Sequence, residues 1–388
     1  MTEVKVPPPE SLEIDKIHDL IRSSGPCITL LLPPYRPGEQ SKPIAGMVRT
    51  NLQVAQHQLE ERNVPGNITR DLVEPLEQLA RDPDFLAGSH WSRVIFRSGN
   101  VLRQFTLTEG VKPALFVGGC FEIRSILAEL DLPADFYVLK ISKKNVDLHR
   151  SAGLHEERVK LPAGVTENLD EFLEFEPPDH DLEDRSAAGA STGSMPGVRF
   201  GTGSGRETQS TYLADFYKAV DRGVRELLGV RDAPLVLAGV DEDTALYRAN
   251  NRYANLLARS VSGNPAGSLL DNGTLLKAYE IVRADRAERA VSALLDSRER
   301  VAPARFTTGL STILRAAVEG RVARLYIDQA ARMFGLFEGT RRSGHWNWGQ
   351  EDLLNVAAVE TLLQGGSAYS LPTGRIPDGA PIAAILRY

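Results

Sequence analysis

The stretch from residue 177 to residue 210 is the feature that most restricts how this chain folds. It begins with acidic residues, continues with Ala, Gly and Ser, and ends in Gly201-Thr202-Gly203-Ser204-Gly205-Arg206, without helical or strand periodicity. More than thirty such residues inside a compact domain are typical of a functional or disordered loop. Directly after it, apolar residues recur at helical spacing from Leu213 to Leu228, and Gly229 ends the pattern. The sequence therefore predicts a long loop that leads into a well-packed helix.

The residues before residue 133 predict an α/β block with its strands in one sheet. The apolar run Cys27–Leu32 is ended by two prolines, as expected of a buried strand. The break Asn63-Val64-Pro65-Gly66 separates two helical segments. The other elements expected in this block, residues 1–132, are helices at about 13–23, 44–61, 67–81 and 121–130, and a hairpin of strands 94–96 and 101–107.

The rest of the chain divides into a middle block, residues 133–268, and a third block, residues 269–388. Helices interleaved with short buried strands predict a layered α/β domain for the third block. We therefore expect an α/β (α+β) fold of three domains with mixed sheets. The middle elements expected are strands 135–141, 146–149, 158–161 and 234–240 and helices 213–228 and about 242–258, and the later ones are helices 275–298, 308–319 and 351–363 and strands 322–327, 333–337, 368–371 and 381–386.

Composition excludes several classes of protein. With 42% hydrophobic residues the chain has enough apolar surface for real cores, and its two cysteines do not suffice for a disulfide scaffold or an all-cysteine zinc site. The formal net charge of −6 argues against a broad basic coat for nucleic acid, although not against a local contact matched in shape. The polar N-terminus resembles no signal peptide and the apolar runs are too short for a membrane span, so we expect a soluble, cytoplasmic monomer.

No catalytic or cofactor motif stands out along the chain. The glycine-rich stretch lacks the strand, turn and helix of a phosphate-binding fingerprint, and Arg206 stands where a third glycine is needed. There is no nucleophile elbow and no H-E-x-x-H metal motif. His180 lies between two aspartates, and a solvated acidic loop explains this better than a metal site does. His345 lies near two tryptophans, and an aromatic cluster explains it better than a catalytic role does. We expect no cofactor and no metal.

The end of the loop is the remaining candidate for function. Glycines there allow the backbone to approach another surface closely, and arginines pair with phosphates. A loop of this kind on a rigid helix suits a narrow, RNA-lined cavity, while a surface loop without a function is the alternative. The residues expected to contact RNA are Arg199, Gly201, Gly203, Gly205, Arg206, Glu207, Thr208, Gln209 and Ser210.

The segment Gly205–Ser210, read with the helix behind it, resembles the G-R-G-G-Q-S loop and helix of archaeo-eukaryotic class-1 peptide chain release factors. The run Ile28–Pro34 is similar to their I-S-L-Y-I-P-P strand, and Tyr137–Ser142 to the strand that opens their middle domain. The third block, including Gly320–Tyr326, resembles the C-terminal domain that they share with Pelota-type rescue factors. The degree of divergence points to the bacterial branch of this family, which is associated with ribosome rescue and hibernation.

Two departures from the family pattern define what the resemblance implies. In the family, two glycines precede the glutamine that enters the peptidyl transferase centre and positions water for ester hydrolysis; here these positions hold Glu207 and Thr208, and only Gln209 is retained. The stop-codon motif N-I-K-S is also missing, and the corresponding helical stretch reads His57-Gln58-Leu59-Glu60. The resemblance therefore implies a protein of this shape without peptide release and without decoding.

These expectations combine into a ribosome-binding factor that occupies the A site in hibernation or rescue and is not an enzyme. By the resemblance, its partners are the RNA of the large ribosomal subunit near the peptidyl transferase centre, the A site of the small subunit, and a translational GTPase such as elongation factor Tu. Two alternatives stay open: a peptidyl-tRNA hydrolase that uses Gln209, and a protein-interaction scaffold that has left the ribosome.

Overall fold

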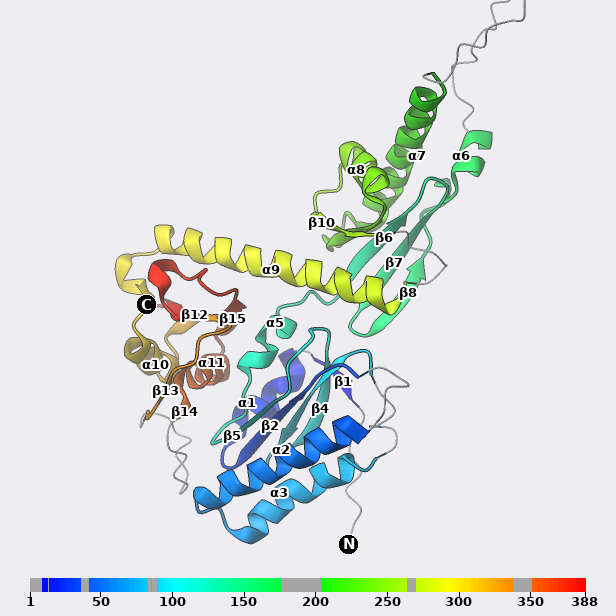
Figure 1. Cartoon of the computed structure of the whole chain (residues 1–388). Helices are drawn as coiled ribbons and strands as arrows, with labels where there is room; N and C mark the ends of the chain where they lie inside the picture. The colour runs from blue at the N-terminus through cyan, green and yellow to red at the C-terminus, as the bar shows by residue number, and fades with distance from the viewer. Residues whose placement is uncertain are drawn as a thin grey trace, which may run out of the picture. The chain divides into compact units, whose positions relative to one another are not determined.

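The computed structural model describes residues 9–12, 14–35, 42–82, 85, 89–175, 204–263, 270–337 and 351–388 (Figure 1). The chain forms two compact units. We call Met1–Leu132 with Arg283–Tyr388 the terminal unit, and Pro133–Val282 the middle unit. Mixed sheets alternate with helices in both, so the predicted α/β class is confirmed. The division into three domains stays a prediction.

The first half of the terminal unit is a five-stranded sheet in the order β1-β4-β3-β2-β5. Side chains alternate across β2 (Cys27–Leu32), so Ile28 and Leu30 pack under α2 (Lys42–Glu61) and α3 (Gly66–Leu79), while Leu31 faces a second core. The predicted strand and both predicted helices are confirmed. The other strands are β1 (Glu10–Ser11), β3 (Ser92–Arg97), β4 (Leu102–Leu107), which forms the predicted hairpin with β3, and β5 (Ala114–Gly118).

The second half of the terminal unit is a four-stranded sheet in the order β11-β16-β12-β15. Helices α9, α10 and α11 follow the predicted positions, but the expected strand 333–337 shortens to β13, whose two residues pair with β14. The elements are α9 (Asn272–Arg300), β11 (Phe306–Thr307), α10 (Leu310–Val318), β12 (Val322–Asp328), β13 (Phe334–Gly335), β14 (Glu351–Asp352), α11 (Leu353–Leu363), β15 (Ser367–Leu371) and β16 (Ile382–Leu386).

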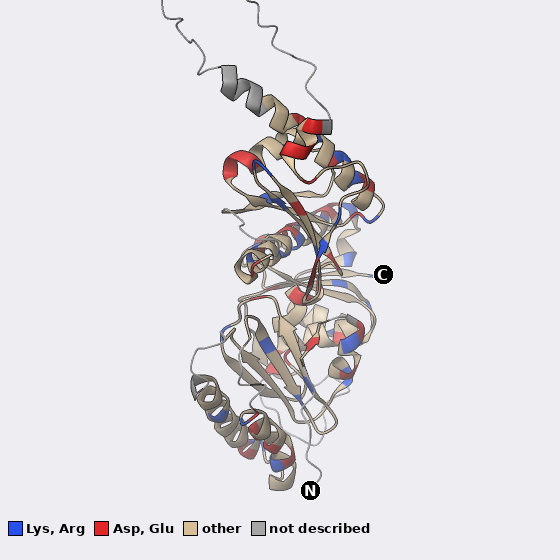
Figure 2. Ribbon diagram, turned by 90° about the vertical axis from the view of Figure 1, so that its right-hand side faces the viewer, with Lys and Arg blue, Asp and Glu red and all other residues tan. Residues whose placement is uncertain are grey.

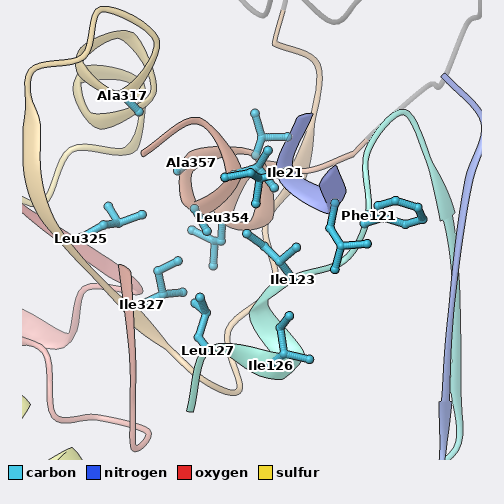
Figure 3. Packing of buried hydrophobic residues seen from close by; sticks show 14 of the residues in the cluster. Ile21, Phe121, Ile123, Ile126, Leu127, Ala317, Leu325, Ile327, Leu354 and Ala357 are labelled. Atoms are coloured by element: carbon cyan, nitrogen blue, oxygen red, sulfur yellow. The ribbon is translucent and has the colours of Figure 1, made fainter. Parts of the chain in front are cut away.

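The two halves of the terminal unit share one hydrophobic core, although they are far apart in the sequence. Figure 3 shows α1 (His18–Arg22) and the segment of η2 (Arg124–Ile126) and α5 (Leu127–Leu130) packed with residues of α10, α11 and β12. Asn355 of α11 adds a polar clamp: its Nδ2 donates to the Phe121 carbonyl at 2.9 Å, and its Oδ1 accepts from the Ile123 N–H at 2.9 Å. The first and third sequence blocks are thereby one compact body.

A buried ionic cluster lies at the same junction. The Arg124 guanidinium pairs with the Asp352 carboxylate and donates from Nη2 to the Ala331 carbonyl at 2.7 Å. Glu122 lies beside this pair, and burial raises the pKa of its carboxyl to about 7, although the charge of Arg124 acts in the opposite direction. The carboxyl therefore titrates near neutral pH because it is desolvated more strongly than it is paired.

The middle unit is a five-stranded sheet in the order β10-β9-β6-β7-β8. The strands β6, β9 and β10 run parallel, and β6, β7 and β8 form an antiparallel meander. The elements are β6 (Phe136–Ile141), β7 (Val146–Ala152), β8 (His155–Val159), α6 (Leu169–Phe175), α7 (Ser204–Leu228), β9 (Leu235–Gly239), α8 (Asp241–Asn250) and β10 (Leu256–Ser262).

The predicted helix at 242–258 is wrong in its second half. Helix α8 ends at Asn250, the backbone turns extended at Asn251, and β10 follows from Leu256. The N–H and C=O groups of this segment pair with β9 in a parallel ladder, which supplies tertiary partners that local helical spacing does not reveal. Of the helices in the described part of the chain, none is long and apolar enough to cross a membrane.

Candidate functional site

Helix α7 begins at Ser204, earlier than the sequence predicts. The expected loop, 177–210, therefore ends seven residues sooner, and the backbone of Gly205–Ser210 is helical. The reason is visible in the sequence: each glycine inside a helix costs about 1 kcal/mol relative to alanine, and Glu207 and Thr208 avoid this cost where release factors have two glycines. Three other candidate contacts, Arg199, Gly201 and Gly203, lie outside the described residues.

The buried face of α7 fixes the direction of the helix. Phe216 and Val220 are fully buried in the middle-unit core, and the Phe216 ring lies 5.6 Å from the ring of Phe172 on α6. At Gly223 the helix touches the chain so closely that a Cβ would lie 2.9 Å from the Val165 side chain. The predicted apolar spacing of this helix is confirmed, and its glycine is explained by close packing.

The first turns of α7 extend beyond the sheet. The Tyr217 hydroxyl donates to the carbonyl of Ser142, directly after β6, so this turn of α7 is level with the carboxyl ends of the parallel strands. The helix from Ser204 to Tyr217 spans about 20 Å at the rise of an α-helix. Figure 1 shows this projection in dark green. The candidate residues at the start of α7 are thus held well away from the core by a helix that the core anchors.

The carboxyl edge of this sheet is acidic. We define it as residues 142–145, 160–174, 211–218 and 241–243, which carry eight Asp or Glu and four Lys. One carboxylate is held in place by a hydroxyl, because Ser262 Oγ donates to Asp241 Oδ1 at 2.7 Å. The excess of negative charge repels RNA phosphates at this edge.

Asp243, in the first turn of α8, is the buried member of the carboxyl edge. Its Oδ1 has no hydrogen-bond partner among the described residues, and burial raises the pKa of the carboxyl. The nearby Lys143 ammonium instead pairs with the exposed Glu242 carboxylate at 3.2 Å. Neither group is placed as a nucleophile with an adjacent base.

A groove of about 550 Å³ opens beside the same edge. Arg158 crosses it, and its Nη2 lies 2.6 Å from Asp147 Oδ1 and 2.7 Å from Glu167 Oε2. The Arg158 guanidinium is therefore paired with two carboxylates of the groove. Within the described ranges no group of three His, Cys, Asp or Glu side chains is arranged to hold a metal ion.

The remaining sequence candidates fall at separate places. His180 and His345 lie outside the described residues. His57, where the decoding motif is missing, is on the last turns of α2, where its Nε2 lies 3.4 Å from the exposed Glu61 carboxylate. Cys27 is buried in β2, as expected, and neither Cys27 nor Cys120 forms a disulfide bond.

Sequence reasoning missed Asp221. This buried carboxylate lies on the apolar face of α7, where its Oδ2 accepts from Arg225 Nε at 2.9 Å and its Oδ1 accepts from the Arg252 N–H at 3.1 Å. The sequence does contain a signal for this buried carboxylate. An acidic residue follows Val220 directly, inside a run of apolar residues at helical spacing.

Comparison with known proteins finds a family that is similar to part of this chain. Residues 136–284 match the family model described as Bacterial archaeo-eukaryotic release factor family 7. The middle unit is therefore similar in sequence to this release-factor-like family. The matched segment is almost the whole middle unit, including α7, and covers less than half of the chain. A search of curated proteins finds no match.

Solved structures similar to this chain include an archaeal translation termination factor, aRF1, at 14% identity over 97% of this chain and 99% of that chain, with a TM-score of 0.25. Pelota of Archaeoglobus fulgidus matches at 14% identity over 77% of this chain and 80% of that chain, with a TM-score of 0.36. Dom34 of S. cerevisiae, which interacts with Hbs1, matches at 13% identity over 74% and 73%, with a TM-score of 0.30. With TM-scores this low, we transfer no residue role from these structures.

Proposed function

We propose that this release-factor-like protein is a ribosome-associated translation factor that occupies the A site, in hibernation or rescue, without decoding stop codons and without releasing peptide. The observation that carries the proposal is the family match over the middle unit, together with the 25-residue helix α7 that projects from it. In the proposed complex the start of α7 points towards the RNA of the large ribosomal subunit near the peptidyl transferase centre. The terminal unit contacts the A site of the small subunit, together with a translational GTPase such as elongation factor Tu.

The backbone of α7 supports the absence of peptide release. The glutamine of a release factor enters its site on bare glycine backbone, whereas Gln209 follows Glu207 and Thr208 within a continuous helix. Gln209 is the sixth residue of α7, beyond the first four whose N–H groups lack a partner within the helix, so its backbone N–H is engaged in the helix and is not presented to an ester. A negative charge at Glu207 adds repulsion from RNA.

The α2–α3 hairpin supports the absence of decoding. Its tip holds Asn63 with a φ of 57°, and the helix before it reads His57-Gln58-Leu59-Glu60 in place of the N-I-K-S motif. This stretch lacks the lysine of that motif and carries a carboxylate at Glu60, which weakens its attraction for messenger RNA phosphates.

Ribosome co-sedimentation across a salt series tests the proposal. Protein from growing and from stressed cells is expected to migrate with monosomes or large subunits, and to dissociate as the salt concentration rises. Recovery only at the top of the gradient in both growth states, with non-ribosomal partners in a pull-down, would replace this proposal with that of an interaction scaffold.

Turnover of peptidyl-tRNA on ribosomes tests the catalytic part. We expect no hydrolysis above background by the wild-type protein and the same result for Gln209→Ala. Hydrolysis by the wild type that Gln209→Ala abolishes would establish a peptidyl-tRNA hydrolase instead. The double change Glu207→Gly with Thr208→Gly is the matched variant, because it restores the backbone pattern of release factors while keeping Gln209.

A further inference from the structure

The amino edge of the middle-unit sheet gathers arginines that the proposed function does not use. We call Arg222, Arg225, Arg231 and Arg252 the arginine edge; all four side chains are exposed. Two lie on the last turns of α7, and the others lie on the loops that enter β9 and β10. In Figure 2 the last turns of α7 carry blue segments next to red ones.

Hydrogen bonds hold the parts of the arginine edge together. The buried Asp221 carboxylate binds both the Arg225 side chain and the Arg252 backbone N–H, which ties α7 to the loop before β10. The Tyr253 hydroxyl of that loop donates to the carbonyl of Ala233 at 2.6 Å, and so joins the two loops. The four arginines therefore start from a fixed backbone, which reduces the entropy lost when a ligand binds.

The guanidinium groups at this edge are largely available. Those of Arg222 and Arg252 have no side-chain partner among the described residues, and Arg231 Nη1 donates only to the neutral Tyr137 hydroxyl at 2.9 Å. The buried Asp221 carboxylate is engaged by two partners, Asp232 accepts from the neutral Asn255, and Glu226 is exposed one turn after Arg222. The edge therefore presents four exposed guanidinium groups beside two exposed carboxylates.

The chemistry favours phosphate over an acidic protein surface. Guanidinium groups bind phosphate oxygens through two parallel N–H bonds. A protein interface of ordinary size has an apolar centre, and Val230 is the one large apolar side chain exposed at this edge in the described part of the chain. We propose that the arginine edge binds the phosphate backbone of RNA, as a second contact at the opposite end of the sheet from the start of α7. The proposal rests on the proposed function only for the source of that RNA, the ribosome.

Binding to two probes tests the arginine edge, with the full-length protein in each case. The first probe is a labelled RNA duplex of about 16 base pairs, the second purified bacterial ribosomes. Arg222→Gln with Arg252→Gln removes two charges that have no side-chain partner among the described residues, and Lys144→Gln with Lys160→Gln is the control, with the same charge change at the carboxyl edge. We expect the arginine variant to bind the duplex about 10-fold more weakly, and its salt slope to fall by about 1 to 2, while the control stays within about 2-fold of wild type.

The outcomes separate the two proposals. Wild-type binding to ribosomes with no change in the arginine variant on either probe overturns the arginine edge and leaves the proposed function standing. If the protein binds the RNA duplex through these arginines but does not bind ribosomes, the arginine edge stands as an RNA contact and the proposed function is overturned. Equal weakening of RNA binding in both double variants also overturns the edge as an RNA contact.

Discussion

The two units of this protein bury charged side chains at different kinds of place. In the terminal unit, Glu122 and Arg124 lie at the junction where α11 meets the segment before α5, and Asn355 clamps the same segment. In the middle unit, the buried carboxylates Asp221 and Asp243 lie at the two edges of one sheet, next to exposed charged side chains. Buried polar contacts fix one arrangement of the chain, whereas exposed charges select partners. The buried charges of the terminal unit therefore join two distant segments, and those of the middle unit lie beside surfaces that can bind a partner.

The largest effect is expected from Asn355→Ala in the terminal unit. The change leaves the Ile123 N–H and the Phe121 carbonyl buried without their partner, which costs about 2–4 kcal/mol. Urea unfolding measures the loss. Asn250→Ala, which removes one half-buried bond to the Leu246 carbonyl in the middle unit, is the control and costs about 1 kcal/mol or less. Equal losses in the two variants would contradict a special role for the buried clamp.

A smaller loss is expected from Asp221→Ala, the change at the buried carboxylate that ties α7 to the loop before β10. Removing it frees the Arg252 N–H and loosens the loop before β10, at a cost of about 2 kcal/mol. The same variant should weaken RNA binding, because the arginine edge is less ordered. Asp215→Ala, whose carboxylate forms an exposed pair with Lys218 at 2.9 Å, serves as the control and should change neither quantity.

The pH dependence of the junction follows from Glu122. Its carboxyl has a pKa near 7 in the folded protein and 4.5 as the ordinary value, so the folded protein binds its proton more tightly than the unfolded chain does. The stability that this group contributes is present in full below pH 4.5 and is lost as the pH rises through 7. Glu122→Gln should equal wild type below pH 4.5 and exceed it by about 2–3 kcal/mol above pH 7. A difference that does not vary with pH in unfolding titrations would refute the assignment.

The smallest effect is expected from Lys143→Ala at the carboxyl edge. Its ion pair with Glu242 is exposed on both sides, so the free energy of unfolding should change by less than about 0.5 kcal/mol. Affinity for the RNA duplex should also stay the same, since this edge is acidic. Weaker RNA binding by this variant would show that the RNA duplex binds at the carboxyl edge of the sheet and not at the arginine edge.

The sequence predicts local elements well where hydrophobic periodicity is strong. The strand Cys27–Leu32, the hairpin of β3 and β4, and the apolar face of α7 are all present where expected. Their signals lie within one element, so neighbouring residues suffice to reveal them.

Features that depend on distant segments could not be predicted in this way. The sequence predicts a helix over the start of β10. It misses the strand because the hydrogen bonds that hold β10 extended come from β9, a separate segment of the chain. The shared core of the terminal unit joins Ile21 to Leu354, and no pattern in either segment indicates the other. The early start of α7 had a local signal, the helix-forming residues Glu207 to Gln209, which the glycines before them obscured.

Competition with A-site transfer RNA tests the central claim most directly. Ribosomes with an empty A site and ribosomes with that site filled by transfer RNA are compared for binding of the full-length protein under one salt condition. The account predicts binding to the first and loss of binding to the second, with no peptidyl-tRNA hydrolysed in either case. Equal binding to both ribosome preparations would contradict occupation of the A site.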